Sequence, residues 1–397
     1  MKKRWIALAL GIAAAAGTGL YQGQRSPALA PPLTIDSGVG AERLALSPDG
    51  RLLAEESVQE QVLLYDAVTG EQKCAFGVRT AHTGRMIFSQ NGRRLLTENT
   101  RPSPANPTGA VQVWDTATGA QISRFVPPGQ ATAMGPDIVT FSPDLRWAVV
   151  HGGQRCTVYD IATGGVVRVL PLRPLNSYLN SQGAFSPNAG LLAVSGAAGG
   201  LQIWDTKTWQ PIHATVGRAF RGAGIHFSLD GTRLALGSKA GLAWWDTRTW
   251  RQEGRFPLRS SRGLSRGSHD SYYFSSDSRS LMVNQGDPAN VLHQVDCVTG
   301  RETLTVPDQE LQHISLTGNR GQTWVVPRSY QSLLYRDTYC IWNTARSQVQ
   351  YQITLPTVSN FYVLGRFQIH STAFSADGHV FAAGGFDDGI IRVWRLP

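Results

Sequence analysis

The feature that most constrains how this chain can fold is a turn motif that recurs eight times along it. Each copy has an apolar residue followed by Ser-Pro-Asp-Gly or a variant, and an apolar segment comes directly after the motif. Five of the seven intervals between copies are 42 to 47 residues, a length that suits one supersecondary unit per repeat. The serine, a threonine in the seventh copy, stands at positions 47, 89, 142, 186, 228, 275, 317 and 375.

A second short motif marks another turn in most repeats. It begins with Trp-Asp or a related pair, as at Trp114 and Asp115, and ends with Thr-Gly, as at 118–119. Proline in the first motif presets the backbone angle φ, while aspartate binds its own backbone and glycine accepts positive φ in both motifs. The apolar segments between the motifs, such as 191–194, are short enough to be strands. The sequence therefore predicts strands joined by two kinds of tight turn.

With this period and these Trp-Asp ends, residues 33–397 resemble the WD40-repeat family. The resemblance implies an all-β fold, namely an eight-bladed β-propeller of four-stranded antiparallel blades. The Ser-Pro-Asp-Gly repeats are also similar to those of exported TolB-type propellers. The seventh repeat is degenerate, with its motifs reduced to 316–319 and 341–343. The recurring phenylalanine and tryptophan residues are expected to pack between blades.

The two ends of the repeat region are expected to meet. The third strand of the eighth repeat is the last one along the chain, and a spare segment, Leu33 to Ile35, precedes the first repeat. Propellers that resemble this chain close through one sheet shared by both ends, which removes exposed sheet edges. We therefore expect the N-terminal strand to complete the last blade.

The sequence also departs from the WD40 pattern. The Gly-His pair before the first strand is missing, and His82 and His370 are its nearest remnants. The last repeat offers His370, Asp388 and Trp394 of the family's hydrogen-bonded tetrad, but Ala383 occupies the serine or threonine region. The partners of the family therefore cannot be transferred to this chain from its motifs.

The N-terminus carries a targeting signal. Three basic residues at 2–4 precede an apolar run at 5–16, which is typical of a secretory signal peptide. The apolar stretch is slightly short of the ~20 residues that span a bilayer, so cleaved export and a short membrane anchor both remain open. We predict a signal peptide or anchor at 1–20, a tether at 21–32 and the propeller at 33–397. The expected location is the periplasm or cell envelope, with membrane contact only through the N-terminal segment.

Charge and cysteine content exclude several function classes. The formal net charge is +9, but no dense basic run appears, so no nucleic-acid partner is expected. The excess charge reflects either arginine-rich composition or an anionic ligand. None of the four cysteines forms a Cys-x-x-Cys pair, which leaves zinc and redox chemistry without support. We predict small buried cysteines, no metal and no cofactor.

The long insertions all fall on one side of the predicted blades, which we call the loop-rich face; the two turn motifs define the opposite, regular-turn face. Binding residues are often carried by variable loops on a rigid scaffold. Arginines of the 257–271 loop could hold an anion or simply be solvated, and aromatic loop residues could anchor a partner or pack over a blade edge. These partner-binding candidates are Arg259, Arg262, Arg266, Tyr178, Tyr330, Phe361 and Tyr362.

Two further candidates lie on the regular-turn face. Trp209 and Trp250 replace the glycine of the Thr-Gly turn in the fourth and fifth repeats. Their indoles could stand side by side and dock a peptide or a sugar, or each ring could fold onto its own blade.

Catalytic motifs are poorly supported. A Gly-x-Ser-x-Gly match at 263–267 lies in a loop between predicted blades, whereas a nucleophile elbow needs a strand-to-helix turn. We therefore predict no catalytic residues and a non-catalytic interaction scaffold that binds another protein on the loop-rich face. A purely structural module of an envelope assembly is one alternative. The other is a propeller hydrolase or lyase acting on a small molecule or glycan at the central channel.

Overall fold

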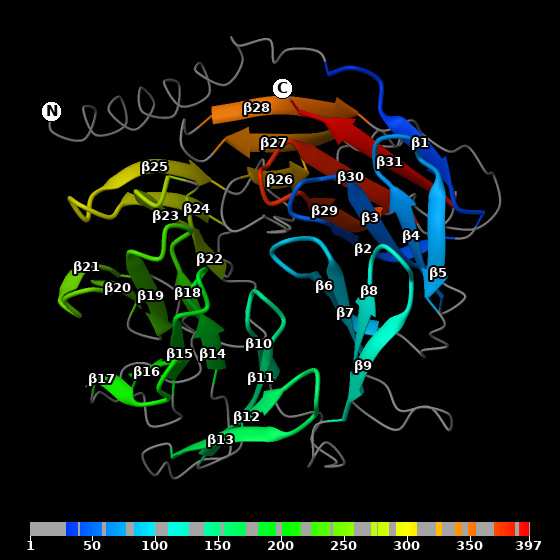
Figure 1. Ribbon diagram of the computed structural model, residues 1–397. Helices are drawn as coiled ribbons and strands as arrows, with labels where there is room; N and C mark the ends of the chain where they lie inside the picture. Colours follow the sequence, from blue (N-terminus) through cyan, green and yellow to red (C-terminus); the bar gives the residue numbers. More distant parts are fainter. Residues whose placement is uncertain are drawn as a thin grey trace, which may run out of the picture.

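The described residues form 31 β-strands in eight antiparallel sheets that follow one another around a ring, in the order of the sequence (Figure 1). First strands of neighbouring blades contact one another, so they surround the centre of the ring. The computed structural model describes residues 29–38, 40–57, 61–76, 83–99, 110–126, 139–151, 155–171, 182–195, 201–215, 224–238, 241–257, 271–275, 277–285, 291–307, 323–327, 338–343, 348–354, 369–385 and 389–396.

Six of the blades have four strands that are consecutive in sequence. Blades 1 and 2 contain β2 (Ala41–Leu46), β3 (Leu52–Ser57), β4 (Val62–Asp66), β5 (Gln72–Phe76), β6 (Thr83–Phe88), β7 (Arg94–Asn99), β8 (Val111–Asp115) and β9 (Gln121–Phe125). Blades 3 and 4 contain β10 (Val139–Phe141), β11 (Trp147–His151), β12 (Arg155–Asp160), β13 (Val166–Pro171), β14 (Gln182–Phe185), β15 (Leu191–Ser195), β16 (Leu201–Asp205) and β17 (Pro211–Thr215). Blades 5 and 6 contain β18 (Ile225–Phe227), β19 (Arg233–Ser238), β20 (Gly241–Asp246), β21 (Gln252–Phe256), β22 (Ser271–Phe274), β23 (Ser280–Gln285), β24 (Val291–Asp296) and β25 (Glu302–Pro307).

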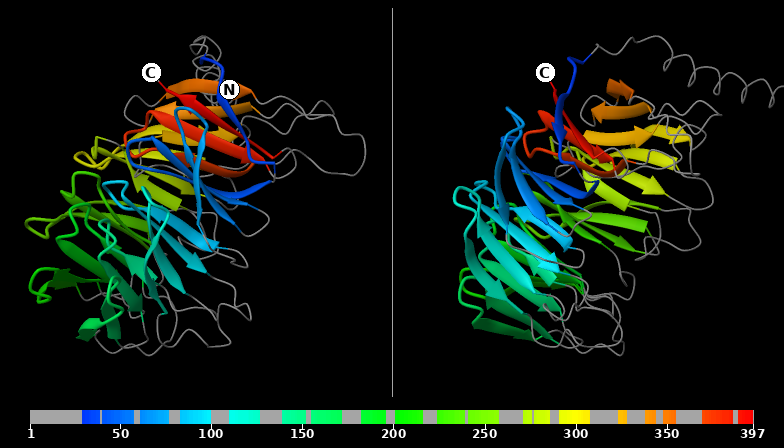
Figure 2. Two further views of the ribbon diagram at one scale, coloured as in Figure 1. Left: turned by 45° about the vertical axis from the view of Figure 1, so that its right-hand side comes forward. Right: turned by 90° about the vertical axis from the view of Figure 1, so that its right-hand side faces the viewer.

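Blade 8 confirms the predicted closure. Its strands β29 (Ile369–Phe374), β30 (Val380–Gly385) and β31 (Ile390–Arg395) are completed on the outside by β1 (Leu33–Asp36). The register pairs Leu33 with Val393 and Asp36 with Ile390. Just beyond β1, the Ser37 amide and hydroxyl both donate to the carbonyl of Gly389, at 2.9 and 3.0 Å. Figure 2 shows β1, in blue, running beside the red last strand.

Blade 7 is the blade with the fewest described strands. Among the described residues it has three, β26 (Thr323–Pro327), β27 (Thr338–Asn343) and β28 (Gln348–Thr354). This is the degenerate repeat, which lacks the Ser-Pro-Asp-Gly turn that shapes the start of the other blades. Residues 308–322, between β25 and β26, lie outside the described part of the chain, so four strands stay a prediction for this blade.

The serine of the first turn has a structural role that the motif alone did not reveal. In blade 1 the buried Ser47 hydroxyl donates to Asp49 Oδ1 at 2.7 Å and accepts the amide of Leu52 at 2.9 Å. The same pair of bonds recurs in six other blades, with serine-to-aspartate or serine-to-asparagine distances of 2.5 to 2.8 Å. Each hydroxyl thereby ties the turn to the start of the second strand.

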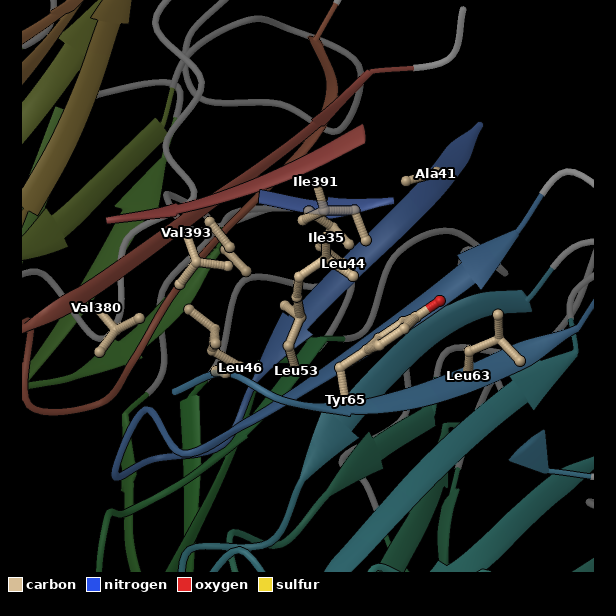
Figure 3. Close-up of a cluster of buried hydrophobic side chains, with 13 residues drawn as sticks. Ile35, Ala41, Leu44, Leu46, Leu53, Leu63, Tyr65, Val380, Ile391 and Val393 are labelled. Carbon is tan, nitrogen blue, oxygen red and sulfur yellow. The ribbon is translucent and has the colours of Figure 1, made fainter. Parts of the chain in front are cut away.

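Most of the buried side chains lie between blades, as the recurring aromatic residues predicted. Figure 3 shows the seam between blades 8 and 1, where Ile35 and Val393 pack against Leu44 and Leu53. Between blades 1 and 2 the ring of Phe76 lies 5.4 Å from that of Trp114. Contacts of this kind join each rigid sheet to its neighbours.

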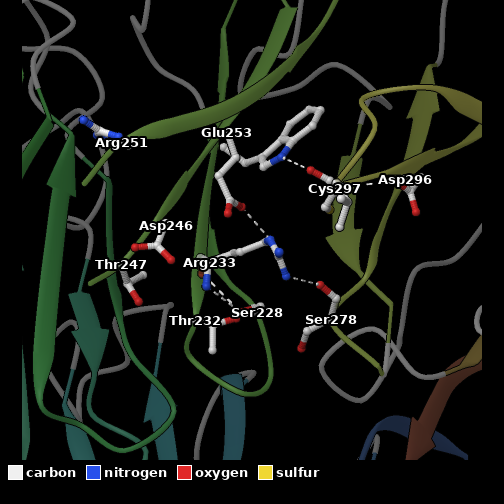
Figure 4. Close-up of polar contacts among 12 residues, drawn as sticks. Ser228, Thr232, Arg233, Asp246, Thr247, Arg251, Glu253, Ser278, Asp296 and Cys297 are labelled. Carbon is white, nitrogen blue, oxygen red and sulfur yellow. Dashed lines mark hydrogen bonds and ion pairs between the residues drawn. The ribbon is translucent and has the colours of Figure 1, made fainter. Parts of the chain in front are cut away.

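Polar groups also join neighbouring blades. Arg233 of blade 5 pairs with Glu253 of the same blade at 2.7 Å and donates to the carbonyl of Ser278 in blade 6 at 3.1 Å. The indole of Trp244 donates to the carbonyl of Cys297 at 2.9 Å across the same seam (Figure 4). These bonds satisfy groups that would otherwise be buried without partners.

Both ends of the described chain lie on the regular-turn face. Leu33 approaches Gly70 in the second turn of blade 1, and the Leu396 amide donates to the carbonyl of His379 in the first turn of blade 8. Leu29, inside the predicted tether, packs against a buried cluster of blades 7 and 8 that includes Leu396. The described part of the tether is therefore docked on the propeller. No helix among the described residues is long and apolar enough to cross a membrane.

Candidate functional site

Most of the predicted partner-binding residues lie outside the described part of the chain. The predicted signal segment at 1–20 also lies outside the described residues, as does the Gly-x-Ser-x-Gly match at 263–267. The same holds for seven of the nine binding candidates, namely Tyr178, Arg259, Arg262, Arg266, Tyr330, Phe361 and Tyr362.

The two remaining candidates, Trp209 and Trp250, lie in separate contacts. Trp209 is buried, and its ring meets Trp147 of blade 3 edge-on at 5.8 Å. Trp250 stacks on His213 of blade 4 at 5.2 Å with an angle of 10° between the rings. Each indole thus leans on the preceding blade, which the sequence analysis did not anticipate. This packing gives both tryptophans a structural role within the propeller.

The described residues bring together a set of polar side chains where the channel opens on the loop-rich face. In blade 1, Arg43 of the first strand pairs with Glu56 of the second at 3.4 Å. In blade 2, Arg85 pairs with Glu98 at the equivalent positions. The carboxylate side chains are 0% and 5% exposed, while the arginine side chains are 48% and 42% exposed. Two half-exposed guanidinium groups are therefore held in place by buried carboxylates.

Arg85 links this pattern to blade 3. Its guanidinium donates to the carbonyl of Val139 at 2.8 Å and lies 5.0 Å from the centre of the Phe141 ring. In blade 3, His151 stands at the position of Glu56 and Glu98, and its Nε2 lies 2.9 Å from Oγ1 of Thr140 on the first strand. We call the six side chains Arg43, Glu56, Arg85, Glu98, Thr140 and His151 the polar cluster.

His151 is also 3.3 Å from a thiol, through its Nδ1 and the sulfur of Cys156. Such a pair resembles the start of a nucleophilic dyad, but burial raises the pKa of Cys156 to about 12. Burial, with a smaller contribution from the Arg85 charge, lowers the pKa of His151 to about 4. Both groups are neutral near pH 7, and the thiolate that would act as nucleophile does not form. The predicted burial of the cysteines is confirmed for Cys156 and Cys297, but it is wrong for Cys74, which is only half-buried.

A pocket of about 300 Å³ lies between the first strands of blades 4, 5 and 6 and the first turn of blade 3. Its lining includes Phe185, Phe227 and Phe274, together with the polar rings of His226 and Tyr273. The two polar rings lie 4.8 Å apart. Burial lowers the pKa of His226 to about 4, so its imidazole is neutral near pH 7. The pocket can therefore hold an apolar part of a ligand, and its two uncharged polar rings can form hydrogen bonds with a polar part of the same ligand.

The described residues contain no group of three His, Cys, Asp or Glu side chains placed to hold a metal ion. Sequence reasoning missed the polar cluster and the pocket. A signal for the cluster was present, since Glu55, Glu56 and Glu98 interrupt apolar strands and Arg43 and Arg85 precede them.

Comparison with known proteins agrees with this architecture. The sequence model for the WD domain, G-beta repeat, matches residues 362–395. WD repeat-containing protein 1 of Gallus gallus is 25% identical over 176 residues, which are 41% of this chain and 26% of that protein. Its Mus musculus counterpart is 26% identical over 32% of this chain and 19% of that protein. The matched segments thus span about a fifth to a quarter of these relatives.

A solved structure extends the likeness to nearly the whole chain. The C-terminal WD40 domain of Sif2 superimposes with a TM-score of 0.62 at 11% identity, over 94% of this chain and all of that one. At this identity the likeness concerns the fold. The repeated turns and the shared closing sheet make this chain a β-propeller, whose fold is similar to that of a WD40 domain and whose residues 362–395 match the WD repeat model.

Proposed function

We propose that this propeller is an interaction scaffold that binds another protein on its loop-rich face, where the channel opens between blades 1, 2 and 3. The observation that carries the proposal is the pair of half-exposed arginines, Arg43 and Arg85, each fixed by a buried carboxylate. A side chain held in one position loses little conformational entropy when it binds. Arginine is also enriched among the residues that dominate protein interfaces.

The difference between the two faces of the propeller supports the choice of the loop-rich face. The regular-turn face consists of short turns whose polar groups are used internally, as the serine and aspartate bonds show. The loop-rich face receives the long insertions, and the candidates Tyr178, Arg259, Arg262, Arg266, Tyr330, Phe361 and Tyr362 are proposed to extend the binding surface there. An anionic segment of the partner would suit these arginines.

We further propose that the chain is exported, through residues 1–20 as a signal peptide or anchor. The position of the chain ends is consistent with this arrangement, because the tether leaves the propeller on the regular-turn face. A tethered propeller would then direct its loop-rich face away from the membrane. Cell fractionation with N-terminal sequencing tests this proposal; a full-length chain confined to the cytosol would contradict it.

Site-specific crosslinking tests the binding face. A photoreactive amino acid would replace Arg43 or Arg85, and Arg51 would serve as the matched control because its side chain is 79% exposed on the regular-turn face. Positions 43 and 85 are expected to trap the same protein in cells, while position 51 does not trap it. The proposed face is wrong if position 51 traps that protein as efficiently, or if neither cluster position traps any protein.

A second candidate function is an enzyme acting on a small molecule or glycan at the channel, and the pocket around His226 is the observation that favours it. A general base works best when its pKa lies near the working pH, and a pKa of about 4 leaves His226 a weak base. The pocket therefore favours binding over proton transfer. A hydrolase and lyase screen that compares the wild type with His226→Ala decides the matter, and activity lost on substitution would establish the enzyme.

A further inference from the structure

The outer strand of blade 3, β13, exposes more large hydrophobic residues than any other described strand. Eight large hydrophobic residues are exposed among the described residues, and three of them, Val166, Val167 and Val169, lie on β13. Their exposed fractions are 59%, 37% and 48%. Single exposed apolar residues are ordinary on a protein surface, whereas a row of three along one strand is not.

β13 is also the edge of its sheet. The strand order of blade 3 is β10, β11, β12 and β13, so one side of β13 pairs with β12 and its other side has no strand partner in the described chain. A free edge presents unpaired backbone amides and carbonyls to any extended segment that approaches. Blade 8 shows the arrangement that such an edge can accept, since β1 adds to β31 there.

Among the described positions, the other outer strands expose fewer large hydrophobic residues than β13 does. β5 exposes Lys73, β21 exposes Glu253 and β25 exposes Glu302, and none of these strands has an exposed large hydrophobic residue among the described positions. β9 and β17 each expose a single large hydrophobic residue, Ile122 and Ile212. β13 also carries an exposed arginine and ends in proline, so the row of valines is what distinguishes it from the other outer strands. Three exposed valines on β13 mark it as an edge that a partner can use.

We propose that β13 binds an extended segment of another protein, which adds a fifth strand to blade 3 and carries an acidic residue between apolar ones. The acidic residue follows from charge complementarity with Arg168. That side chain is exposed among the valines and forms no ion pair with any described residue. Apolar residues on either side would cover the valines, and cross-strand pairs of both kinds stabilise a sheet.

A second copy of this chain fits the edge less well. Two antiparallel β13 strands place all three valines opposite apolar residues only when the pairing centres on Arg168. That register sets two guanidinium groups directly opposite each other, which is destabilising. The observations therefore favour a partner of opposite charge. This rim site lies away from the loop-rich face and does not depend on the function proposed above.

Two synthetic peptides test the proposal with the full-length protein. Each alternates valine and threonine over eight residues, with glutamate at the centre of one and lysine at the centre of the other. We expect the glutamate peptide to bind at least 10-fold more tightly by fluorescence anisotropy, and Arg168→Glu to reverse that preference. Hydrogen exchange should slow at 166–170 when the peptide is bound.

Matched variants make the result decisive. Val167→Lys with Val169→Lys should abolish binding of the glutamate peptide, whereas Val298→Lys, at a residue 73% exposed on the regular-turn face, should leave it unchanged. The proposal is overturned if both peptides bind equally, if neither binds at millimolar concentration, or if Arg168→Glu has no effect. Sedimentation that shows a dimer abolished by the double lysine variant would assign the edge to a second copy instead.

Discussion

Single residues at the turns carry a measurable strain. Five non-glycine residues in the described part of the chain have positive φ, and each stands where a turn in another blade has glycine. The left-handed conformation costs a non-glycine residue about 1 to 2 kcal/mol. Whether that cost is offset depends on what the side chain touches, which differs between the five turns.

Ala189 and Leu145 provide a matched pair for measuring this balance. Ala189 has φ of 57° and a small side chain, so Ala189→Gly is expected to stabilise the protein by about 0.5 to 1 kcal/mol. Leu145 has φ of 55° but is 1% exposed, so Leu145→Gly should destabilise it by about 2 kcal/mol or more. Denaturant titration measures both midpoints. Equal shifts in the same direction would contradict this account.

Glu55 is a buried carboxylate with an incomplete set of hydrogen bonds. Tyr65 Oη donates to its Oε2 at 3.0 Å, but its Oε1 has no partner among the described residues. Burial raises the pKa of Glu55, while the hydroxyls of Ser37 and Tyr65 act in the opposite direction. A carboxyl with a raised pKa in the folded state lowers stability as pH rises through that pKa.

Glu55→Gln is therefore expected to stabilise the protein at pH 8, by about 1 to 3 kcal/mol, and to have little effect below about pH 4. Glu98→Gln is the control, because its buried carboxylate is paired with Arg85 and its loss should destabilise the protein at pH 8. Denaturant midpoints at pH 4 and 8 for the three proteins check both signs. A lower midpoint for Glu55→Gln at pH 8 would refute the interpretation.

At the scale of an element, the closing strand β1 has a register that can be tested chemically. Leu33 lies opposite Val393, and Thr34, one residue on, points to the other face of the sheet. Cysteines at directly opposed positions of antiparallel strands fall within disulfide reach. Leu33→Cys with Val393→Cys is expected to crosslink under mild oxidation and to raise stability by about 2 to 5 kcal/mol.

Thr34→Cys with Val393→Cys is the slipped control and should remain reduced. Non-reducing electrophoresis and mass spectrometry read out both pairs, and thermal unfolding measures the stabilisation. Efficient crosslinking of the slipped pair would show that β1 and β31 do not keep the register described above.

The whole molecule should lose stability in acid because its second turns share one chemistry. The aspartate that begins each turn accepts amide hydrogens, as Asp115 does from Ala117 and Thr118 at 2.9 and 2.8 Å. Hydrogen bonds, chiefly from the Thr118 amide, lower the pKa of Asp115, and amide or hydroxyl donors do the same at Asp66, Asp205, Asp246 and Asp296.

A lowered pKa in the folded state adds stability above the unfolded value near 3.9, and this stability is lost as pH falls through the folded value. The contribution of these turns to stability should therefore be level above about pH 5 and fall steeply below about pH 4. Denaturant midpoints across this range test the profile, and Asp115→Asn should reduce the acid loss because asparagine keeps the acceptor oxygen without titrating. Unchanged stability down to pH 2 would exclude this role for the turns.

Much of this molecule could be predicted from its sequence, because its repeats are specified by local chemistry. The turn motifs located the strand ends, and the spare segment at Leu33 correctly predicted the closing strand. Contacts between separate strands could not be derived in this way. The pairing of Arg43 with Glu56 depends on strand register, and the contact of Trp209 with Trp147 depends on the distance between blades. Neither quantity is encoded in a local motif.

The closing sheet of blade 8 joins strands that are made at very different times during synthesis of the chain. Ser37 and the carbonyl it binds at Gly389 are separated by 352 positions, so β1 is made long before the strand that receives it. At about 5 to 20 residues per second, β1 waits roughly 20 to 70 s on the ribosome for its partner. During that interval Ile35, which is buried in the finished ring, has no strand to cover it. Closure of the ring therefore waits until β31 has been made.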